Sequence, residues 1–391
     1  MPKQTILSLN NKKIILATIS LMAGIFWGYN QYNLLATLAI TLLLLLVSFL
    51  YNKKPKNTLY TIPLIIIFYI GALRTLNIQS RHKNFYKNSS KETIDIIASI
   101  KSIQKIKSKL YTSVIQLQTS QKKTPLTPNG SPFKKRLQIF LKKMPNIKVD
   151  DTIKIKNIRI KKPNNQDFNL YLMKEGISTT LFKQSLDYTL IKRPPYSLTR
   201  WIHDKKTAIH SKFKKRLSPL SFSLFSSIFL GNRNNNKKLS NTLKVKFTFW
   251  GILHFLARSG LHLILFLLIC EFILKSIPVC FAIKQIIALL IACIYLLLSW
   301  PSVSFLRAFS AFVLFKVCPF LNTKPDPVYT VALVCFSMTL YNPLQIFFLN
   351  FQLSFGLTFA LALLYRIKTK TKQRDRLFCK KTQQSPYHQI Y

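Results

Sequence analysis

Long apolar runs alternate with lysine-rich stretches along this chain, and the apolar runs lie towards its two ends with a long polar segment between them. A helix needs about 20 predominantly apolar residues to cross the hydrocarbon core of a bilayer. The clumped pattern is typical of a polytopic α-helical membrane protein, and we expect about eight spans. The predicted spans are residues 14–28, 33–51, 59–76, 247–275, 282–300, 302–320, 327–341 and 344–365.

The N-terminal residues resemble a signal peptide, because Lys3, Lys12 and Lys13 precede the first apolar run. No clear cleavage site with small residues follows, and two more predicted spans come next, so we expect an uncleaved first span. Lysines also follow the second predicted span. The positive-inside rule then places both termini in the cytoplasm and residues 78–216 outside it, with the protein in the cell inner membrane.

The segment 219–232 leaves the count of spans open, because it is apolar but short for a span. As a re-entrant or interfacial helix it keeps the topology given above, and the predicted cytoplasmic loops then carry the lysines of the second half. Against this, Arg233, Lys237 and Lys238 would lie outside. If 219–232 crosses the bilayer, every later span is inverted.

The polar segment 78–216 carries short alternating stretches that predict β-strands. About five such strands in this length favour a small β-barrel of the OB type, although many small β-domains would look similar. Its basic outer face is either a track for a phosphate backbone or a solvated lysine surface. Residues 198–217 predict a basic helix lying along the membrane surface. The predicted strands lie in 93–104, 113–119, 136–143 and 152–162.

Charge adds a further indication. Lys and Arg number 58 against 11 Asp and Glu, which gives a net charge of +47. Such a balance suits anionic partners, either nucleic acid or lipid headgroups, but a Lys-, Asn- and Ile-rich composition also arises from an AT-rich genome. The six cysteines show no disulfide framework and no metal-ligand spacing. We expect no metal and no cofactor.

Polar residues interrupt the predicted helix 247–275, where His254, Arg258 and His262 recur every four positions and so share one helical face. Ser259 and Gly260 lie beside them. A charged side chain in hydrocarbon is costly unless it faces protein or water. The stripe therefore predicts a functional cavity. The alternative is that both histidines make interhelical hydrogen bonds and the arginine reaches the headgroups.

Four sequence segments occur in a recognisable order: LFSSIFLGNRNN (224–235), GILHFLARSGLHL (251–263), SFLRAF (304–309) and FQLSF (351–355). In sequence and order they resemble the competence region of the ComEC family. Residues 161–182 resemble the end of the N-terminal OB-containing domain of that family. The resemblance covers roughly residues 12–366. It implies an inner-membrane channel component that passes single-stranded DNA into the cytoplasm during natural transformation.

The implied organisation has five parts: a three-span bundle (1–77), an extracytoplasmic OB-like β-domain (78–192), connecting amphipathic or re-entrant helices (193–246), a competence-type membrane core (247–366) and a basic cytoplasmic tail expected to be disordered (367–391). Two features depart from the family. Arg258 stands where an aliphatic residue is usual. Full-length members carry a C-terminal metallo-β-lactamase-type domain, and the tail here has no cluster of His and Asp.

These features predict partners and a candidate path. No catalytic dyad, phosphate loop or ATP site is evident, so we expect no enzymatic activity, with a separate nuclease, an ATP-driven motor and a DNA receptor as partners beside single-stranded DNA and the bilayer. The oligomeric state stays open. The residues expected to line or brace the path are His254, Arg258, Ser259, Gly260, His262, Arg307, Asn350 and Gln352. The rival functions are transport of another anionic solute or lipid, and a membrane anchor that displays a basic β-domain.

Overall fold

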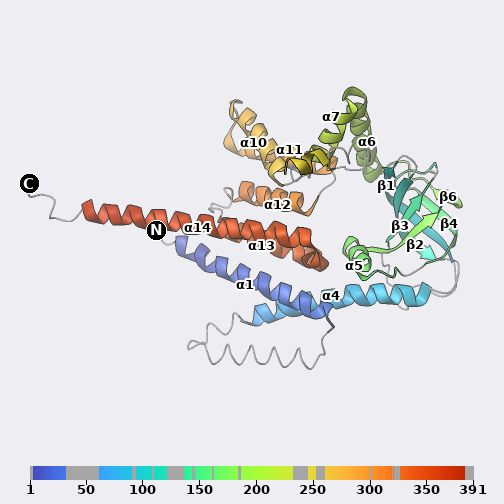
Figure 1. Ribbon diagram of the computed structural model, residues 1–391, viewed down its shortest axis with the longest axis horizontal. Coiled ribbons are helices and arrows are strands. Elements are labelled where there is room, and N and C mark those ends of the chain that lie inside the picture. The colour runs from blue at the N-terminus through green and yellow to red at the C-terminus, as the bar shows by residue number, and fades with distance from the viewer. Residues whose placement is uncertain are drawn as a thin grey trace, which may run out of the picture. The chain divides into compact units, whose positions relative to one another are not determined.

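The computed structural model describes residues 3–31, 61–89, 94–107, 110–120, 136–142, 146–160, 163–183, 186–231, 245–251, 260–299, 302–318, 320 and 326–383. Within these ranges the chain is mostly helical and carries one mixed β-sheet (Figure 1). It divides into two compact units, Met1–Thr75 with Leu306–Tyr391, and Leu76–Phe305. The predicted span 33–51 lies outside the described residues.

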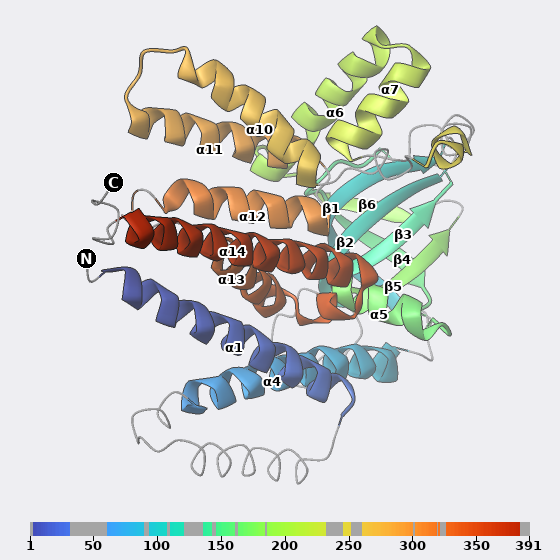
Figure 2. The same ribbon diagram turned by 60° about the vertical axis from the view of Figure 1, so that its left-hand side comes forward.

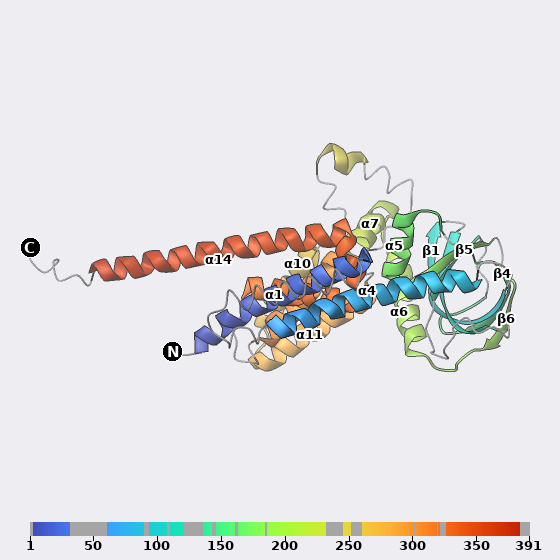
Figure 3. The same cartoon turned by 90° about the horizontal axis from the view of Figure 1, so that it is seen from below.

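The first unit is a bundle of apolar helices. It contains α1 (Lys3–Tyr29), the first part of α4 (Thr61–Ser89), most of α12 (Val303–Val317), α13 (Pro327–Tyr341), the 3₁₀ turn η2 (Pro343–Phe347) and α14 (Leu349–Gln383). The helices predicted at 14–28, 59–76, 302–320, 327–341 and 344–365 all fall on these elements. The tail was expected to be disordered from residue 367, and this is wrong, because α14 continues as one helix to Gln383 (Figure 3).

Helices α1 and α4 approach closely because glycines lie where they meet, and they run side by side in Figures 1 and 3. Gly24 and Gly28 are four residues apart on one face of α1. A Cβ atom at Gly28 would lie 2.5 Å from the carbonyl oxygen of Ala72, and one at Gly24 would overlap the backbone of Phe68. This is the small-residue spacing that lets membrane helices pack backbone to backbone. Ser20 adds a hydrogen bond of 2.6 Å to the carbonyl of Leu64.

Helix α13 is joined to both of these helices. Thr18 of α1 donates to the carbonyl of Ala332 at 3.3 Å. Arg74 of α4 donates to the carbonyls of Leu340 and Tyr341, at the C-terminal end of α13. A cation at that end also meets the negative end of the helix dipole. The three helices therefore share backbone-directed hydrogen bonds as well as apolar contact.

The second unit contains the sheet, whose strand order is β5-β3-β2-β1-β4-β6 (Figure 2). All neighbours pair antiparallel except β3 and β5, which are parallel. The predicted strands correspond to β1 to β4. The short helix α5 and two further strands were not predicted individually. The elements are β1 (Ile94–Lys107), β2 (Leu110–Ser120), β3 (Arg136–Leu141), β4 (Thr152–Ile158), α5 (Gln166–Glu175), β5 (Ile177–Lys183) and β6 (Tyr188–Lys192).

One face of the sheet forms an apolar core because buried and exposed residues alternate along its strands. Leu137, Ile139 and Leu141 of β3 are buried, and the intervening side chains point outward. The last turns of α4 add Phe85 and Tyr86 to this core, where the Tyr86 hydroxyl donates to the carbonyl of Ser178. The core of the sheet therefore includes the end of α4, which lies inside the predicted β-domain range 78–192 but before the first predicted strand.

A buried carboxylate joins the sheet to α6 (Leu198–Arg216). Asp151, just before β4, has a side chain that is 0% exposed, and it accepts hydrogen bonds from Arg193 at 2.7 Å and Arg200 at 2.8 Å. Burial alone would raise the pKa of Asp151, but the bonds from Arg193 and the backbone N–H of Lys148, together with both guanidinium charges, hold it below its usual value. Ser197 caps the helix and donates to Asp150.

The apolar elements described after α6 in the second unit include α7 (Pro219–Phe225), the π-helix η1 (Ser226–Leu230), α10 (Gly260–Lys275) and α11 (Phe281–Leu298), and residues 245–249 are also helical. The prediction of one unbroken helix over 247–275 is wrong. Trp250 and Gly251 form a turn, and the backbone of Gly251 is left-handed with φ of 66°. A left-handed glycine ends a helix. Residues 252–259 lie outside the described part of the chain.

Two helices in the described ranges are long and apolar enough to cross a membrane, judged by length and composition: Ile62–Tyr86 and Phe281–Leu298. Shorter apolar helices occupy Lys13–Tyr29, Pro219–Leu230 and Pro327–Tyr341. The eight spans expected from the sequence are therefore matched in part.

The glycine contact predicts a position-specific effect of added methyl groups. Gly24→Ala should destabilise the bundle by about 1–3 kcal/mol, because the new Cβ overlaps the backbone of Phe68. Gly356→Ala is the control, since a Cβ there would meet nothing within 4 Å and alanine favours the helix. Thermal unfolding of the full-length protein in detergent compares the two variants. Equal stability of both would contradict the close packing.

The Asp151 cluster predicts a local loss of stability. Asp151→Asn should weaken the junction of β4 and α6 by about 3 kcal/mol, because two guanidinium groups lose their buried partner. Asp95→Asn is the comparison, because the ion pair of Asp95 with Lys154 is looser, at 3.7 Å, and more exposed, and its loss should cost less than about 1 kcal/mol. Hydrogen exchange of the β4 and α6 amides measures both.

The same carboxylate predicts a pH dependence. The pKa of Asp151 is lower in the folded state than in the unfolded chain, where it is about 3.9. The carboxylate therefore contributes its full stabilisation above about pH 3.9, and this stabilisation is lost as the pH falls through the folded-state pKa. Protection of the β4 and α6 amides should therefore hold at neutral pH and fall only below about pH 4. Loss of protection between pH 5 and 7 would point to another group.

Candidate functional site

The polar stripe predicted before α10 is only partly described. His254, Arg258 and Ser259 lie outside the described residues, so their common face stays a prediction. Gly260 begins α10 and is buried, and His262 is half-buried in the first turn of that helix. That these two residues line a path stays a prediction.

Arg307 is the predicted site residue with the most informative surroundings. It lies on α12, and its Nη1 donates to the carbonyl oxygen of Ser354 on α14 at 2.6 Å. Its guanidinium carbon is 5.8 Å from the centre of the Phe355 ring. The structure thus brings together the SFLRAF and FQLSF segments, which are far apart in the sequence, through one cation.

Two buried polar atoms beside this contact have no hydrogen-bond partner among the described residues. They are Nε of Arg307 and the side-chain oxygen Oγ of Ser354. Leaving a buried donor or acceptor unpaired costs about 1–3 kcal/mol, and more for a charged group. Such a pair of atoms can be satisfied by water or by a passing anion. The arrangement therefore provides fixed positive charge with unused hydrogen-bonding capacity.

The other two predicted residues lie at the start of α14. The side-chain amide of Gln352 donates to the carbonyl of Ile346 at 2.8 Å and so braces the turn from η2 into α14. Asn350 is exposed two residues earlier. Arg307 thus has a partner in the FQLSF segment, and Gln352 supports the local backbone of that segment.

A second candidate surface lies on the outer face of the sheet, where Phe140 and Phe182 stack. Their ring centres are 4.6 Å apart and their planes differ by 9°. The parallel register pairs Phe140 of β3 directly with Phe182 of β5, and Phe182 is 74% exposed. A flat aromatic pair open to solvent can stack a planar base.

Cations lie on the same side of β3. Arg136 is exposed at the start of the strand and Lys142 directly after it, and alternation puts both on the face that carries Phe140. This combination of aromatic rings and positive charge is typical of proteins that bind single strands without sequence preference. We name Phe140 and Phe182 the aromatic platform.

Sequence reasoning identified the basic outer face of the β-domain but missed the platform. The alternation in 136–143 places Phe140 outward, which was a usable signal. The partner Phe182 comes from a parallel strand that follows α5, and nothing local in the sequence predicts that pairing.

A family model described as Competence protein matches residues 228–385. Comparison with curated proteins and with solved structures gave no significant match. The matched range contains the segments 251–263, 304–309 and 351–355, and so it includes both segments that Arg307 joins. The resemblance to the ComEC family is thereby confirmed over this region. That family is membrane-associated and takes part in DNA uptake.

The aromatic platform predicts base-dependent binding. Phe182→Ala should weaken binding of an oligothymidylate by about tenfold, because one stacked base is worth about 1–3 kcal/mol. An abasic oligomer of equal length should bind the wild type and the variant alike, since it keeps only the phosphates. Fluorescence anisotropy with the full-length protein at low salt measures both.

A matched control is available on α5, where Phe168 and Tyr171 form another exposed stacked pair with ring centres 6.2 Å apart. Phe168→Ala should leave oligothymidylate binding unchanged. An equal loss in both variants would show that exposed aromatics act without regard to position, and the platform would lose its role.

Proposed function

We propose that this ComEC-family competence protein is an inner-membrane channel component that passes single-stranded DNA towards the cytoplasm, without chemistry of its own. The observation that carries the proposal is Arg307, a guanidinium held among apolar helices by the carbonyl of Ser354, with its Nε unpaired among the described residues. A cation in such a place is costly unless protein groups or water satisfy it, and intramembrane cations commonly mark polar pathways.

Strand passage requires what this contact offers. Each phosphate of the strand carries a negative charge that hydrocarbon does not accept, so the path must be wet and cationic. Arg307 supplies hydrogen-bond donors, and one of them bonds the Ser354 carbonyl of α14. Asn350 and Gln352 lie at the start of the same helix. The stripe is proposed to act in the same way, through hydrogen bonds and charge, and consists of His254, Arg258, Ser259, Gly260 and His262.

The sheet fits the role of an entry domain that holds the strand. In the order β5-β3-β2-β1-β4-β6, the first five strands with β3 and β5 parallel are compatible with an opened OB-type barrel, and β6 occupies the edge of β4 that would close onto β5. OB folds bind single strands on a strand face, and here the platform of Phe140 and Phe182 lies on the outer face of β3 and β5. In this proposal residues 78–216 are extracytoplasmic.

The remaining parts of the proposal concern topology and partners. About eight spans would place both termini in the cytoplasm. A separate nuclease would degrade one strand, and an ATP-driven motor would supply the energy for transport.

Substitution of Arg307 tests the proposal. Arg307→Ala should lower transformation frequency by at least about tenfold, since the passing strand would lose a hydrogen bond from the guanidinium. One hydrogen bond to a charged group is worth roughly 1.5–3 kcal/mol. Arg307→Lys keeps the charge as a compact ammonium and should retain part of the activity. Transformation is counted with linear DNA, and membrane protein is quantified by blotting.

Arg366→Ala is the matched control, because it removes an equal charge from the same unit and breaks only a loose pair with Asp326 at 3.7 Å. It should leave transformation nearly unchanged. If Arg307→Ala lowers transformation only in proportion to the amount of protein, Arg307 is structural and the channel proposal loses its main support.

A further inference from the structure

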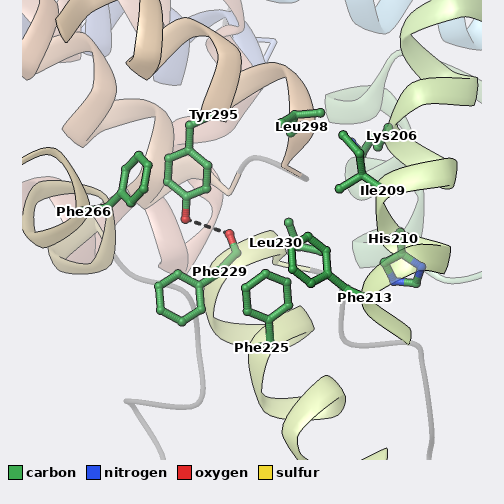
Figure 4. Close-up of a pocket in the computed structure, with 10 residues that line it drawn as sticks. All are labelled: Lys206, Ile209, His210, Phe213, Phe225, Phe229, Leu230, Phe266, Tyr295 and Leu298. Atoms are coloured by element: carbon green, nitrogen blue, oxygen red, sulfur yellow. Dashed lines mark hydrogen bonds between the residues drawn. The ribbon is translucent and has the colours of Figure 1, made fainter. Parts of the chain in front are cut away.

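A cavity of about 190 Å³ lies between helices of the second unit (Figure 4). Its walls are almost entirely apolar and mostly aromatic. A volume several times the roughly 30 Å³ that one water occupies, with so few polar partners, is poorly suited to ordered water. The lining residues come from α6 (Lys206, Ile209, His210, Phe213), from α7 and η1 (Phe225, Phe229, Leu230), from α10 (Phe266) and from α11 (Tyr295, Leu298).

Two hydrogen bonds hold α11 against the other walls. The hydroxyl of Tyr295 donates to the carbonyl oxygen of Phe229 at 2.8 Å, as Figure 4 shows. This carbonyl lies in the π-helix η1, and π-turns occur frequently at functional sites. Lys206 donates to the carbonyl of Ser299 at 2.7 Å, at the C-terminal end of α11. The cavity is thus framed by directed bonds from two elements.

The position of the cavity along α11 indicates its depth in a membrane. Phe281–Leu298 is a candidate span, and both lining residues from it, Tyr295 and Leu298, lie in its last turn. Tyrosine is enriched where hydrocarbon meets headgroups. The cavity therefore opens at the level where lipid acyl chains begin.

Positive charge surrounds the α6 side of the cavity. His210 is flanked on α6 by Lys206 and Lys214, four residues before and after it, so all three share one face. Burial first, and then these two lysines, lower the pKa of His210, so it is neutral at pH 7 and the charge is carried by the lysines. The cationic residues of α6 outnumber its single acid, Asp204: they are Arg200, Lys205, Lys206, Lys212, Lys214, Lys215 and Arg216.

We propose that this cavity binds an acyl chain of an anionic phospholipid, whose headgroup lies against Lys214 and Lys206 on the face of α6. The apolar walls suit a hydrocarbon chain, and the lysines suit the negatively charged phosphate. The end of α11 places the cavity at the boundary between acyl chains and headgroups. A bound lipid would fill the space between α6, η1 and α11 and hold α6 at the membrane surface. The inference does not depend on DNA transport.

The test uses the full-length protein purified in detergent, with phosphatidylglycerol or phosphatidylcholine of identical chains added back. The melting temperature of the wild type should rise by about 3 °C with phosphatidylglycerol and by less with phosphatidylcholine. Ile209→Trp puts a larger side chain into the cavity and should abolish the rise with both lipids. Phe229→Trp, which fills the cavity from η1, should do the same.

Charge variants distinguish the contribution of the headgroup to binding from that of the acyl chain. Lys214→Gln should remove the preference for phosphatidylglycerol while keeping the rise seen with phosphatidylcholine. Lys212→Gln is the control, because it lies about 200° round the helix from His210 and removes the same charge. No rise in the wild type, or an undiminished rise in both tryptophan variants, would overturn the site. An equal effect of both glutamine variants would overturn the headgroup assignment.

Discussion

A guanidinium among apolar helices has to be satisfied by protein or by water, and this constraint governs the helical unit that contains Arg307. Arg307 meets it in part by donating to the carbonyl of Ser354, which ties α12 to α14. The contact joins two short segments that both lie in the range matched by the competence family model. The buried Nε–H of Arg307 has no hydrogen-bond partner among the described residues. A residue kept only for packing would be less costly as leucine, so the charge argues for a polar role.

Other polar groups away from water, in both units, also bond a partner within the protein. In the first unit, glycines allow α1 and α4 to touch, and hydroxyl and guanidinium groups bond backbone carbonyls across helices. In the second unit, Asp151 forms ion pairs with Arg193 and Arg200 and so holds the start of α6 against the sheet. Helix α6 in turn forms one wall of the apolar cavity. One wall of the cavity thus belongs to a helix whose start is held by paired charges.

Local signals were sufficient for much of the fold. Helix α13 occupies the range predicted for it, because Asp326 caps it before Pro327 and Asn342-Pro343 ends it. The alternation of Ile153 and Ile155 with lysines predicts the buried face of β4. Long-range pairing was not predictable in this way. The stacking of Phe140 on Phe182 depends on a parallel pairing across α5, and the break at Gly251 interrupts an apolar run that reads as one helix. Of the predicted site, Arg307 gained a partner, while His254, Arg258 and Ser259 lie outside the described residues.

The central claim is that water and fixed positive charge meet beside Arg307 inside the membrane. Cysteine accessibility tests it most directly, in vesicles holding a variant without native cysteines. Ser354→Cys should react with a membrane-impermeant thiol reagent, and added single-stranded oligonucleotide should slow the reaction. Leu357→Cys, on the same helix with its side chain 67% exposed and facing lipid in this account, should react far more slowly. If the cysteine at position 354 is as unreactive as the one at 357, the surroundings of Arg307 are dry and the account is contradicted.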